Sequence, residues 1–279
     1  MRIFITARPA PRSRIGWPGK TTRRRGRRVK GRGLSMRLQN RVAIITGVSH
    51  AGQVGFALAS AFAFEGAKLS ISSRSAERVQ SRVQELQSRG ATVIGIPADL
   101  TTEEGANRLI RETVEQYGRI DILVNLAGGL TKYGPSDELT VADWDAELNN
   151  NLRSVFLCTR AAWPVMKRQG GGKILNFSTA SGAHGAGPNM LAYNCAKAGV
   201  DALTRTFAKE GKQANIYVNA IGPGLIVTQS NIDSMKPSQE DLQKKWVTME
   251  QIIEAALFLV SSASDGVTGA ILPVQGKGI

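Results

Sequence analysis

A tyrosine and a lysine four residues apart, Tyr193 and Lys197, form the most informative chemical pair in this chain. On a helix, residues i and i+4 share one face, so the phenol and the ammonium would lie side by side. A tyrosine phenol has a pKa of about 10, and a neighbouring cation lowers that pKa because it favours the phenolate. The spacing therefore predicts a general acid and base that exchanges a proton with an alcohol or a carbonyl. The alternative is a surface tyrosine beside a surface lysine.

A glycine-containing turn is the second feature with chemical content. The run from Thr46 to Gly55 reads TGVSHAGQVG and lies between a short apolar stretch and a helical pattern. Glycines let backbone amides approach a diphosphate closely, and the N-terminus of the following helix favours an anion. The turn therefore predicts a dinucleotide site. Because its G-x4-G-x2-G spacing differs from the usual fingerprint, a flexible loop is the alternative.

The end of the second expected strand bears on which dinucleotide would bind. This segment, Ser70 to Ser75, reads SISSRS and holds no carboxylate that could bind the adenosine ribose hydroxyls. Arg74 could instead pair with a 2′-phosphate through charge-assisted hydrogen bonds. We therefore favour NADP(H) as the cofactor, with NAD(H) still open. A solvated Arg74 is the alternative.

Strand and helix patterns alternate from residue 41 onward. Short apolar runs predict strands over 42–46, 68–72, 92–97, 122–125, 173–177, 216–220 and 270–274. Helical patterns cover 54–64, 76–88, 103–117, 144–168, 193–209 and 249–261, and the fourth is expected to break near Pro164. Buried strands that alternate with helices favour a parallel sheet with right-handed crossovers. The sequence thus predicts an α/β fold, a doubly wound Rossmann-type sheet in a single domain over residues 36–279.

The net charge of +14 comes mainly from the first 35 residues. They hold 12 of the 36 Lys and Arg and no acid, so the remainder carries 24 bases against 22 acids. This Arg-rich composition without apolar periodicity predicts a disordered extension over 1–35. Three interpretations of it stay open: electrostatic binding to nucleic acid or an anionic membrane, an Arg-rich targeting peptide, or a non-native stretch before a true start at Met36.

Composition also argues against several classes of protein. No run of 18 apolar residues is present, so we expect no membrane span. The two cysteines, Cys158 and Cys195, and the two histidines, His50 and His184, lack metal-ligand spacing. We therefore expect no metal site and no disulfide framework, and the cysteine usage fits a reducing cytoplasm. Nucleic-acid binding is unlikely, because the near-neutral remainder shows no basic stripe.

Taken in order, the motifs of residues 37–279 resemble those of the classical short-chain dehydrogenase/reductase family. The glycine turn, Asp99-Leu100 after the third strand and Tyr193 with Lys197 match the family's pattern. The matching segments further include Asn125-Leu126-Ala127-Gly128 for its N-N-A-G element, Asn151 for its catalytic asparagine, and Pro223 to Thr228 for its P-G-x-I-x-T stretch. Each motif is common alone, but the set in this order is very unlikely to arise by chance.

The resemblance implies catalytic roles for four residues. Tyr193 would exchange a proton with the substrate oxygen, and Lys197 would lower the pKa of Tyr193 and bind the nicotinamide ribose. Asn151 would hold a water that connects Lys197 to solvent. A hydroxyl after the fifth strand would orient the substrate, and counting along the chain favours Thr179, with Ser178 as its rival.

The resemblance also implies a set of cofactor-binding residues along the carboxyl ends of the strands. They are Gly47, Ser49, Gly52, Val54, Gly55, Arg74, Asp99, Leu100, Asn125, Ala127, Gly128, Tyr193, Lys197, Pro223, Gly224, Ile226 and Thr228. In the family a hydride passes between the nicotinamide and the substrate carbon, and the protein supplies position and electrostatics.

The leading hypothesis is an NAD(P)(H)-dependent oxidoreductase that prefers NADP(H) and acts on a small carbonyl or secondary alcohol. Departures from the family pattern motivate an alternative, a catalytically weak or inactive cofactor-binding sensor or scaffold. These departures are the lengthened glycine turn, Leu126, Thr179 and a short segment between Thr228 and Met249, where the family has its substrate lid. The resemblance further implies a homodimer or homotetramer through the helices at 144–168 and 193–209.

Overall fold

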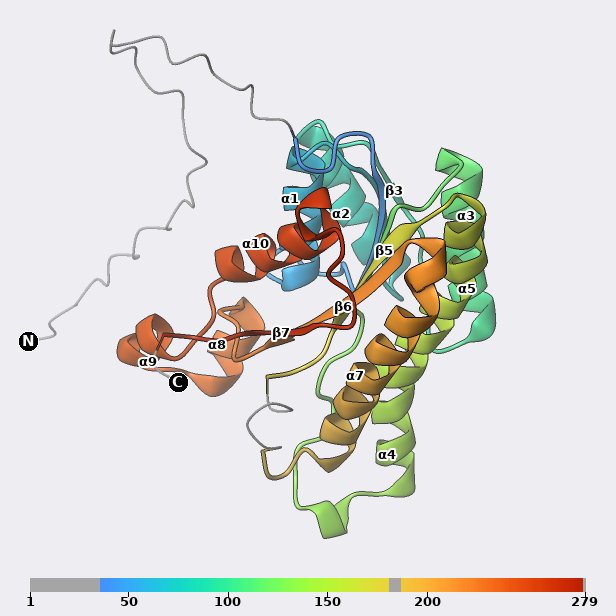
Figure 1. The fold of residues 1–279 in the computed structure, drawn as a ribbon. Coiled ribbons are helices and arrows are strands. Elements are labelled where there is room, and N and C mark those ends of the chain that lie inside the picture. Colours follow the sequence, from blue (N-terminus) through green and yellow to red (C-terminus); the bar gives the residue numbers. More distant parts are fainter. Residues whose placement is uncertain (1–35, 181–186, 278–279) are drawn as a thin grey trace, which may run out of the picture. The chain divides into compact units, whose positions relative to one another are not determined.

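The computed structural model describes residues 36–180 and 187–277. Its core is a seven-stranded sheet in the order β3-β2-β1-β4-β5-β6-β7. Every neighbouring pair of strands is parallel, and helices cover both faces (Figure 1). The predicted doubly wound Rossmann-type sheet is therefore confirmed. The predicted disordered extension at 1–35 and His184 lie outside the described residues, and the domain boundary at residue 36 stays a prediction.

The elements follow the predicted alternation of strands and helices. The strands are β1 Val42–Thr46, β2 Lys68–Ser72, β3 Val93–Gly95, β4 Ile122–Asn125, β5 Gly172–Phe177, β6 Ile216–Pro223 and β7 Ile271–Val274. The α-helices are α1 Val54–Phe64, α2 Ala76–Ser88, α3 Glu103–Tyr117, α4 Val141–Leu148, α5 Ser154–Arg168, α7 Leu191–Gly211, α8 Gln229–Met235, α9 Gln239–Lys244 and α10 Met249–Val260. Short helical turns are η1 Ser136–Glu138, the π-helical η2 Asn149–Arg153, η3 Lys212–Ala214 and η4 Ser262–Ser264.

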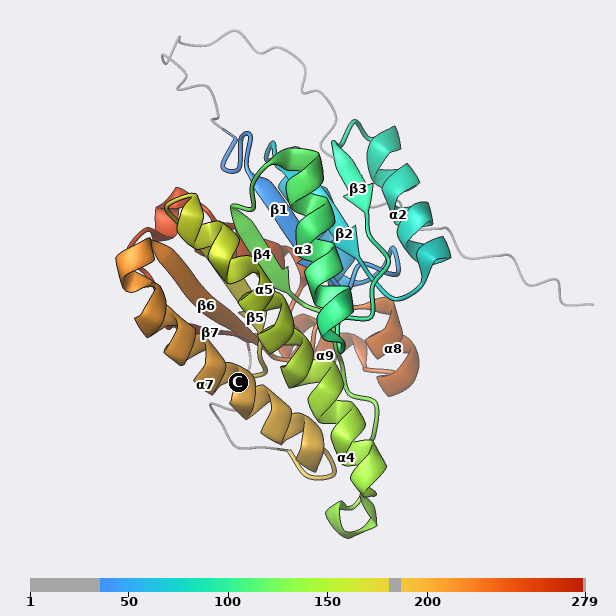
Figure 2. The same cartoon turned by 90° about the vertical axis from the view of Figure 1, so that its right-hand side faces the viewer.

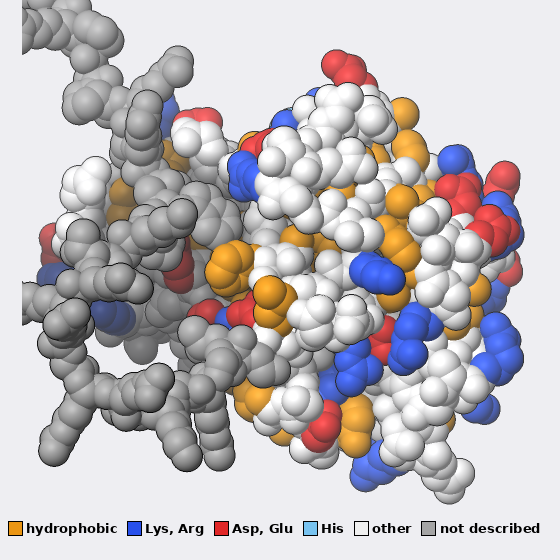
Figure 3. Space-filling view, turned by 90° about the horizontal axis from the view of Figure 1, so that it is seen from above, with side chains coloured by type: hydrophobic (Ala, Val, Ile, Leu, Met, Phe, Trp, Pro, Cys, Tyr) orange, Lys and Arg blue, Asp and Glu red, His pale blue; other side chains and the backbone are white. Residues whose placement is uncertain are grey.

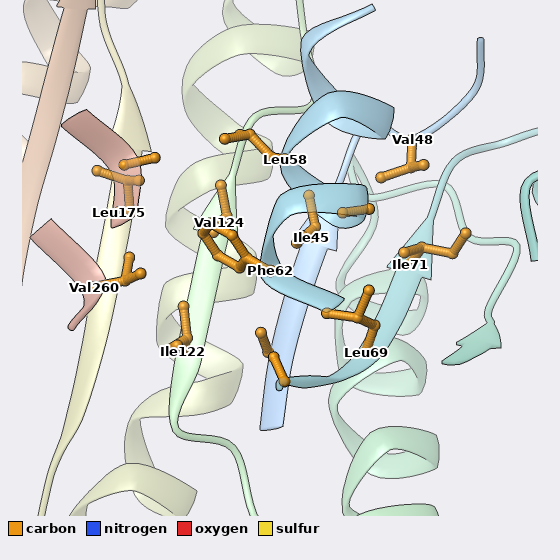
Figure 4. Packing of buried hydrophobic residues seen from close by; sticks show 14 of the residues in the cluster. Ile45, Val48, Leu58, Phe62, Leu69, Ile71, Ile122, Val124, Leu175 and Val260 are labelled. Carbon is orange, nitrogen blue, oxygen red and sulfur yellow. The ribbon is translucent and has the colours of Figure 1, made fainter. Parts of the chain in front are cut away.

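The sheet has one hydrophobic core on each face. Helices α1, α2 and α10 pack on one side, and α3, α5 and α7 pack on the other, where Figure 2 shows them in front of the sheet. Figure 4 shows Leu58 and Phe62 of α1 among side chains of the strands. Ile44 and Ile45, neighbours in β1, belong to opposite cores because successive strand residues point to opposite faces. The continuous apolar runs of the sequence thus correspond to strands buried on both faces.

The predicted helix over 144–168 needs correction. The helical stretch begins earlier, at Val141, because Thr140 caps it by accepting a hydrogen bond from the Asp143 backbone N–H. It is not broken at Pro164, which lies inside α5 between the fully buried Ala162 and Met166. Pro164 itself is exposed, and its buried neighbours Ala162 and Met166 hold α5 continuous. The irregularity lies instead at η2, between α4 and α5.

Two further observations concern the charges on the surface of the described chain and the apolar length of its helices. On the face shown in Figure 3, Lys and Arg side chains are interspersed with Asp and Glu, as the near balance of charge outside the first 35 residues implies. Within the described ranges, no helix is both long and apolar enough to cross a membrane.

Candidate active site

The loops after β1, β2, β3 and β4 line a cleft of about 1250 Å³. The chain runs from β1 outward to β3 and then resumes at β4 on the other side of β1, so the loops after β1 and β4 diverge at this point. Ligands of open α/β sheets bind at such a switch point. Ten of the predicted cofactor residues line the cleft: Gly47, Ser49, Gly52, Val54, Gly55, Arg74, Asp99, Leu100, Ala127 and Gly128. The other seven lie outside this lining: Asn125, Tyr193, Lys197, Pro223, Gly224, Ile226 and Thr228.

Backbone packing at the glycine turn shapes one wall of the cleft. The Thr46 hydroxyl accepts hydrogen bonds from the backbone N–H groups of Leu126 and Ala127, at 2.9 Å each, and thereby ties the end of β1 to the loop after β4. Gly47 has a φ of +79°, and a Cβ there would lie 3.0 Å from the Ala127 nitrogen. A Cβ on Gly55 would lie 2.5 Å from the Gly47 carbonyl oxygen. Despite the longer spacing, Gly55 allows the close approach of helix and turn that a dinucleotide site requires.

Gly55→Ala is therefore expected to destabilise the protein by about 1–3 kcal/mol, because the added methyl group meets backbone atoms that cannot move independently. Urea unfolding measures the change. Gly134→Ala is the matched control, since a Cβ at Gly134 meets nothing within 4 Å. Equal stabilities of the two variants would contradict the assigned packing.

Two arginines provide positive charge at one end of the cleft. Arg74 follows β2, and Arg78 lies one turn later in α2, where both side chains are exposed and line the cleft. Neither arginine forms an ion pair with any residue that the structure describes. An anion could therefore pair with both. The sequence interpretation missed Arg78, which lies in the first turn of α2, shortly after Arg74.

Asp99 lies in the cleft wall, but its side chain is engaged locally. One carboxylate oxygen accepts hydrogen bonds from the Thr101 backbone N–H at 3.0 Å and from the Thr101 hydroxyl at 2.8 Å. These bonds fix the turn that leads into α3. Leu100, beside it, is buried and also lines the cleft.

Lys197 and Tyr193 lie together on α7, beside the end of β5. The Lys197 ammonium is 5.5 Å from the centre of the Tyr193 ring and donates a 2.8 Å hydrogen bond to the Phe177 carbonyl. Lys197 is only 6% exposed, and this burial lowers its pKa to about 8, partly offset by the charges of Glu147 and Asp201. The helical spacing thus brings the predicted pair together.

The pKa of Tyr193 is raised in the structure, not lowered as predicted. Burial of the phenol, reinforced by the negative charge of Glu147, raises the pKa of Tyr193 to about 12. Desolvation disfavours a phenolate because the charged form loses more hydration than the neutral phenol. Tyr193 therefore carries its proton at neutral pH.

Asn151 connects the helix to the cleft through its side chain. Its carboxamide oxygen accepts from the Gly129 N–H at 2.8 Å, and its nitrogen donates to the Gly129 carbonyl at 3.0 Å. The nitrogen also donates to the Glu147 carbonyl at 3.1 Å, the acceptor that the Asn151 backbone N–H would use in an α-helix. The side chain thereby links Gly129 to α4 just before the π-helical turn. Such turns occur frequently at functional sites.

The structure separates the two hydroxyls that compete to orient the substrate. Ser178 is buried, and its hydroxyl points to α7, 3.5 Å from the Lys197 carbonyl. Thr179 is only partly buried and lies at the end of β5, where its carbonyl oxygen packs against Gly222 of β6. This placement favours Thr179 as the residue that reaches a substrate.

Several predicted cofactor residues have structural partners. The Asn125 carboxamide donates to the Thr159 hydroxyl at 3.1 Å and to the Asn176 carboxamide at 2.9 Å, which links β4 to α5 and β5. Gly224 donates its N–H to the Val274 carbonyl. The Thr228 hydroxyl caps α8 by accepting from the Asn231 N–H.

Pro223 is the last residue of β6, and its carbonyl accepts the Ala180 N–H. Ile226 forms a parallel bridge with Val247. These contacts position the loop after β6. The segment beyond it, expected only to be short, forms α8 and α9, and it adds Gln229 and Asp233 to the cleft wall.

The fold and the site define a dinucleotide-dependent oxidoreductase with a tyrosine and lysine pair. Residues 47–276 match the family model described as enoyl-(acyl carrier protein) reductase. The chain belongs to the short-chain dehydrogenase/reductase family. It is accordingly an NAD(P)(H)-dependent oxidoreductase that transfers a hydride, which confirms this part of the leading hypothesis and disfavours the sensor or scaffold.

Two curated relatives illustrate the family. A (2S)-[(R)-hydroxy(phenyl)methyl]succinyl-CoA dehydrogenase subunit BbsD from Thauera aromatica is 38% identical over 246 residues, 86% of this chain and 97% of the relative. A 3-oxoacyl-[acyl-carrier-protein] reductase FabG from Thermotoga maritima is 34% identical over 246 residues, 86% of this chain and 98% of the relative.

Solved structures agree with this placement. A 7α-hydroxysteroid dehydrogenase complexed with NADH and 7-oxo glycochenodeoxycholic acid superposes with a TM-score of 0.80 at 33% identity, covering 88% of this chain and 96% of that one. Levodione reductase superposes with a TM-score of 0.78 at 32% identity, covering 86% of this chain and 98% of that one.

Proposed function

We propose that the protein reduces a carbonyl to a secondary alcohol with NADPH, and that Tyr193 is the general acid. The observation that carries the proposal is the pairing of Tyr193 and Lys197 on α7 beside the end of β5. The neighbouring turn η2 packs against α7, and its Asn151 binds Gly129 in the cleft wall. A phenol that keeps its proton at neutral pH suits the reductive direction, because reduction needs a proton donor.

The cleft fits the cofactor by its shape and by its donors. The glycines at 47 and 55 leave room for a diphosphate where a side chain would collide with backbone, and α1 begins beside them. The two cleft arginines offer positive charge to a phosphate. When bound, the nicotinamide cofactor supplies the hydride.

The residues of this chain then handle the proton. Thr179 orients the substrate carbonyl toward Tyr193, whose phenol donates its proton to the carbonyl oxygen. The Lys197 ammonium stabilises the resulting phenolate by its charge. Asn151 positions both the loop at Gly129 and the π-helical turn. These two segments border the route by which Lys197 regains a proton from solvent.

Arg74 and Arg78 are proposed to select NADPH over NADH by pairing with the 2′-phosphate. Arg74→Ala is expected to lower kcat/KM for NADPH about 10-fold to 100-fold, the range for losing a hydrogen bond to a charged group. Arg78→Ala should act in the same direction. Steady-state kinetics with both cofactors measures the change, and kcat/KM for NADH should stay within a factor of about two.

Arg111→Ala is the matched control for the arginine variants, because Arg111 is an exposed arginine of α3 outside the cleft lining. It should change neither cofactor's kcat/KM. Two results would count against the assignment. One is a wild-type kcat/KM for NADH equal to that for NADPH, and the other is an unchanged ratio of the two in Arg74→Ala.

The substrate class is proposed to be a 3-oxoacyl thioester. Support comes from the relatives named for 3-oxoacyl-[acyl-carrier-protein] reduction and for a hydroxyacyl-CoA dehydrogenation. A panel of a 3-oxoacyl-CoA, a cyclic ketone and a sugar, each followed by NADPH oxidation, tests it. Faster turnover of the thioester supports the class, and preferential turnover of either other compound replaces it.

We further propose that the enzyme acts in the cytoplasm as a homodimer or homotetramer through α4, α5 and α7. These helices lie on one side of the sheet (Figure 2), and Phe156 of α5 is 39% exposed. A symmetric association would cover this side chain. Light scattering on the purified protein measures the number of copies, and a monomer would contradict the proposal.

A further inference from the structure

A buried carboxylate, Glu147 of α4, lies behind the proposed active site and has no part in the mechanism above. Its side chain is 0% exposed. Carboxylates are almost never fully buried unless they are paired or hydrogen-bonded, so its surroundings must compensate for the charge. The sequence interpretation missed it, because a glutamate within an amphipathic helix is typical of a solvated face.

Four donors converge on this carboxylate. One oxygen accepts from the Thr131 N–H at 2.5 Å, from the Thr131 hydroxyl at 2.7 Å and from the Lys132 N–H at 2.8 Å. The other accepts from the Asn151 carboxamide at 2.8 Å. Backbone N–H and carboxamide NH₂ groups only donate, so these contacts match an ionised carboxylate.

These contacts connect the glutamate to two parts of the site at once. Thr131 ends the loop whose residues Leu126 to Thr131 line the cleft. Asn151 holds Gly129 of the same loop and belongs to the π-helical turn. One oxygen of the Glu147 carboxylate therefore fixes the loop at Thr131, and the other oxygen fixes the Asn151 side chain.

The glutamate also lies within electrostatic reach of the catalytic pair, because α4 and η2 pack against α7. Its charge raises the pKa of Tyr193 and opposes the fall in the pKa of Lys197. The other charged groups nearby are Asp201 on α7, which acts on Lys197 in the same sense, and three peripheral side chains. These three are Lys132 and Asp143, whose charged groups pair at 3.5 Å, and the exposed Arg153 of η2.

We propose that Glu147 is a positioning residue of this enzyme, whose buried carboxylate orders the cleft loop and Asn151 and holds a negative charge beside the Tyr193 and Lys197 pair. The proposal rests on the proposed function of that pair. It predicts that the charge of Glu147, and not only its shape, sets the pH range of catalysis.

Glu147→Gln in the full-length enzyme tests the charge with little change of shape. Removing a negative charge favours loss of a proton from both Tyr193 and Lys197. The pKa that controls kcat/KM is therefore expected to fall by about half a unit to one unit, whichever of the two groups it reports. In the reductive direction, the basic limb of the pH profile moves to lower pH. An unchanged limb would overturn the proposal.

Asp121→Asn is the matched control, because Asp121 is another buried carboxylate, paired with Arg41 and Arg119 just before β4, at the opposite end of that strand from the cleft. It should lower stability without moving the limb. Glu147→Asp is the second comparison, since it keeps the charge while shortening the reach to the loop. Its pH profile should stay with the wild type even where its activity falls.

A stability cycle at pH 7 provides a readout that needs no substrate. Urea unfolding of wild type, Glu147→Gln, Lys197→Met and the double variant measures the coupling of the two charges. Glu147→Gln should cost less stability when Lys197 is already Met, because the attraction is then absent. Additive effects would overturn the proposal.

If Glu147→Gln folds only when combined with Lys197→Met, the coupling is supported. Failure of both Glu147→Gln and the double variant to fold contradicts it. Absence of turnover in wild type would refute the proposed function alone, leaving this cycle to judge Glu147.

Discussion

Tyr193→Phe is expected to lower kcat for carbonyl reduction by about 10²-fold to 10⁴-fold, the usual contribution of a positioned general acid. The substitution removes one hydroxyl and keeps the ring that lies 5.5 Å from the Lys197 ammonium. The phenol is partly buried and protonated at neutral pH, so the variant loses the proton donor and little packing. Stopped-flow absorbance of NADPH under single-turnover conditions separates the chemical step from product release.

Cofactor binding should survive in this variant. The glycine turn and the cleft arginines lie on other elements, and the dissociation constant for NADPH, measured by fluorescence, is expected to change less than about threefold. Tyr217→Phe is the matched control, because Tyr217 lies in β6 with its ring over Lys173, away from the cleft lining. Full activity in Tyr193→Phe would refute Tyr193 as the acid.

Lys197→Met is expected to stabilise the protein at pH 7 by about 1–2 kcal/mol while it removes most of the activity. The folded state holds a buried ammonium whose pKa falls to about 8 from the ordinary value of 10.5. This burial costs the wild type free energy of folding, and methionine fills similar space without a charge. The lost hydrogen bond to the Phe177 carbonyl offsets part of the gain.

The stabilisation expected from Lys197→Met depends on pH, and urea unfolding at several pH values measures this dependence. Between pH 8 and 10.5 the unfolded wild type binds more protons at Lys197 than the folded state does, so this group makes stability rise with pH. The advantage of Lys197→Met is therefore full below about pH 8 and disappears by about pH 10.5. A variant that is less stable than wild type at pH 7, by an amount independent of pH, would contradict the buried charge.

The sequence was sufficient for most of the fold because buried parallel strands are continuous apolar runs between turn residues. The runs at Val42–Thr46 and Ile122–Asn125 needed no tertiary information. The start of α4 was missed by three residues, although Thr140 and Asp143 carry a capping pattern that could have found it. The continuity of α5 across Pro164 depends on core packing, which no local pattern contains.

The site was predictable where spacing decides the geometry and not where burial does. Tyr193 and Lys197 meet because they are four residues apart on one helix. The pKa of Tyr193 depends on desolvation and on Glu147, which α4 brings to α7 only in the folded chain. The contact between Asn151 of the π-helical turn and Gly129 likewise joins residues that are far apart in sequence.

The central claim is hydride transfer from the nicotinamide to a carbonyl carbon with a proton from Tyr193. The most direct measurement incubates the full-length enzyme with NADPH deuterated at C4 and a 3-oxoacyl-CoA, and then analyses the alcohol by mass spectrometry. Separate reactions use each of the two C4 epimers, beside Tyr193→Phe. We predict one deuterium on the carbinol carbon from one epimer alone, and almost none with the variant. Cofactor that binds without transferring deuterium to this or any carbonyl of the panel would contradict the account.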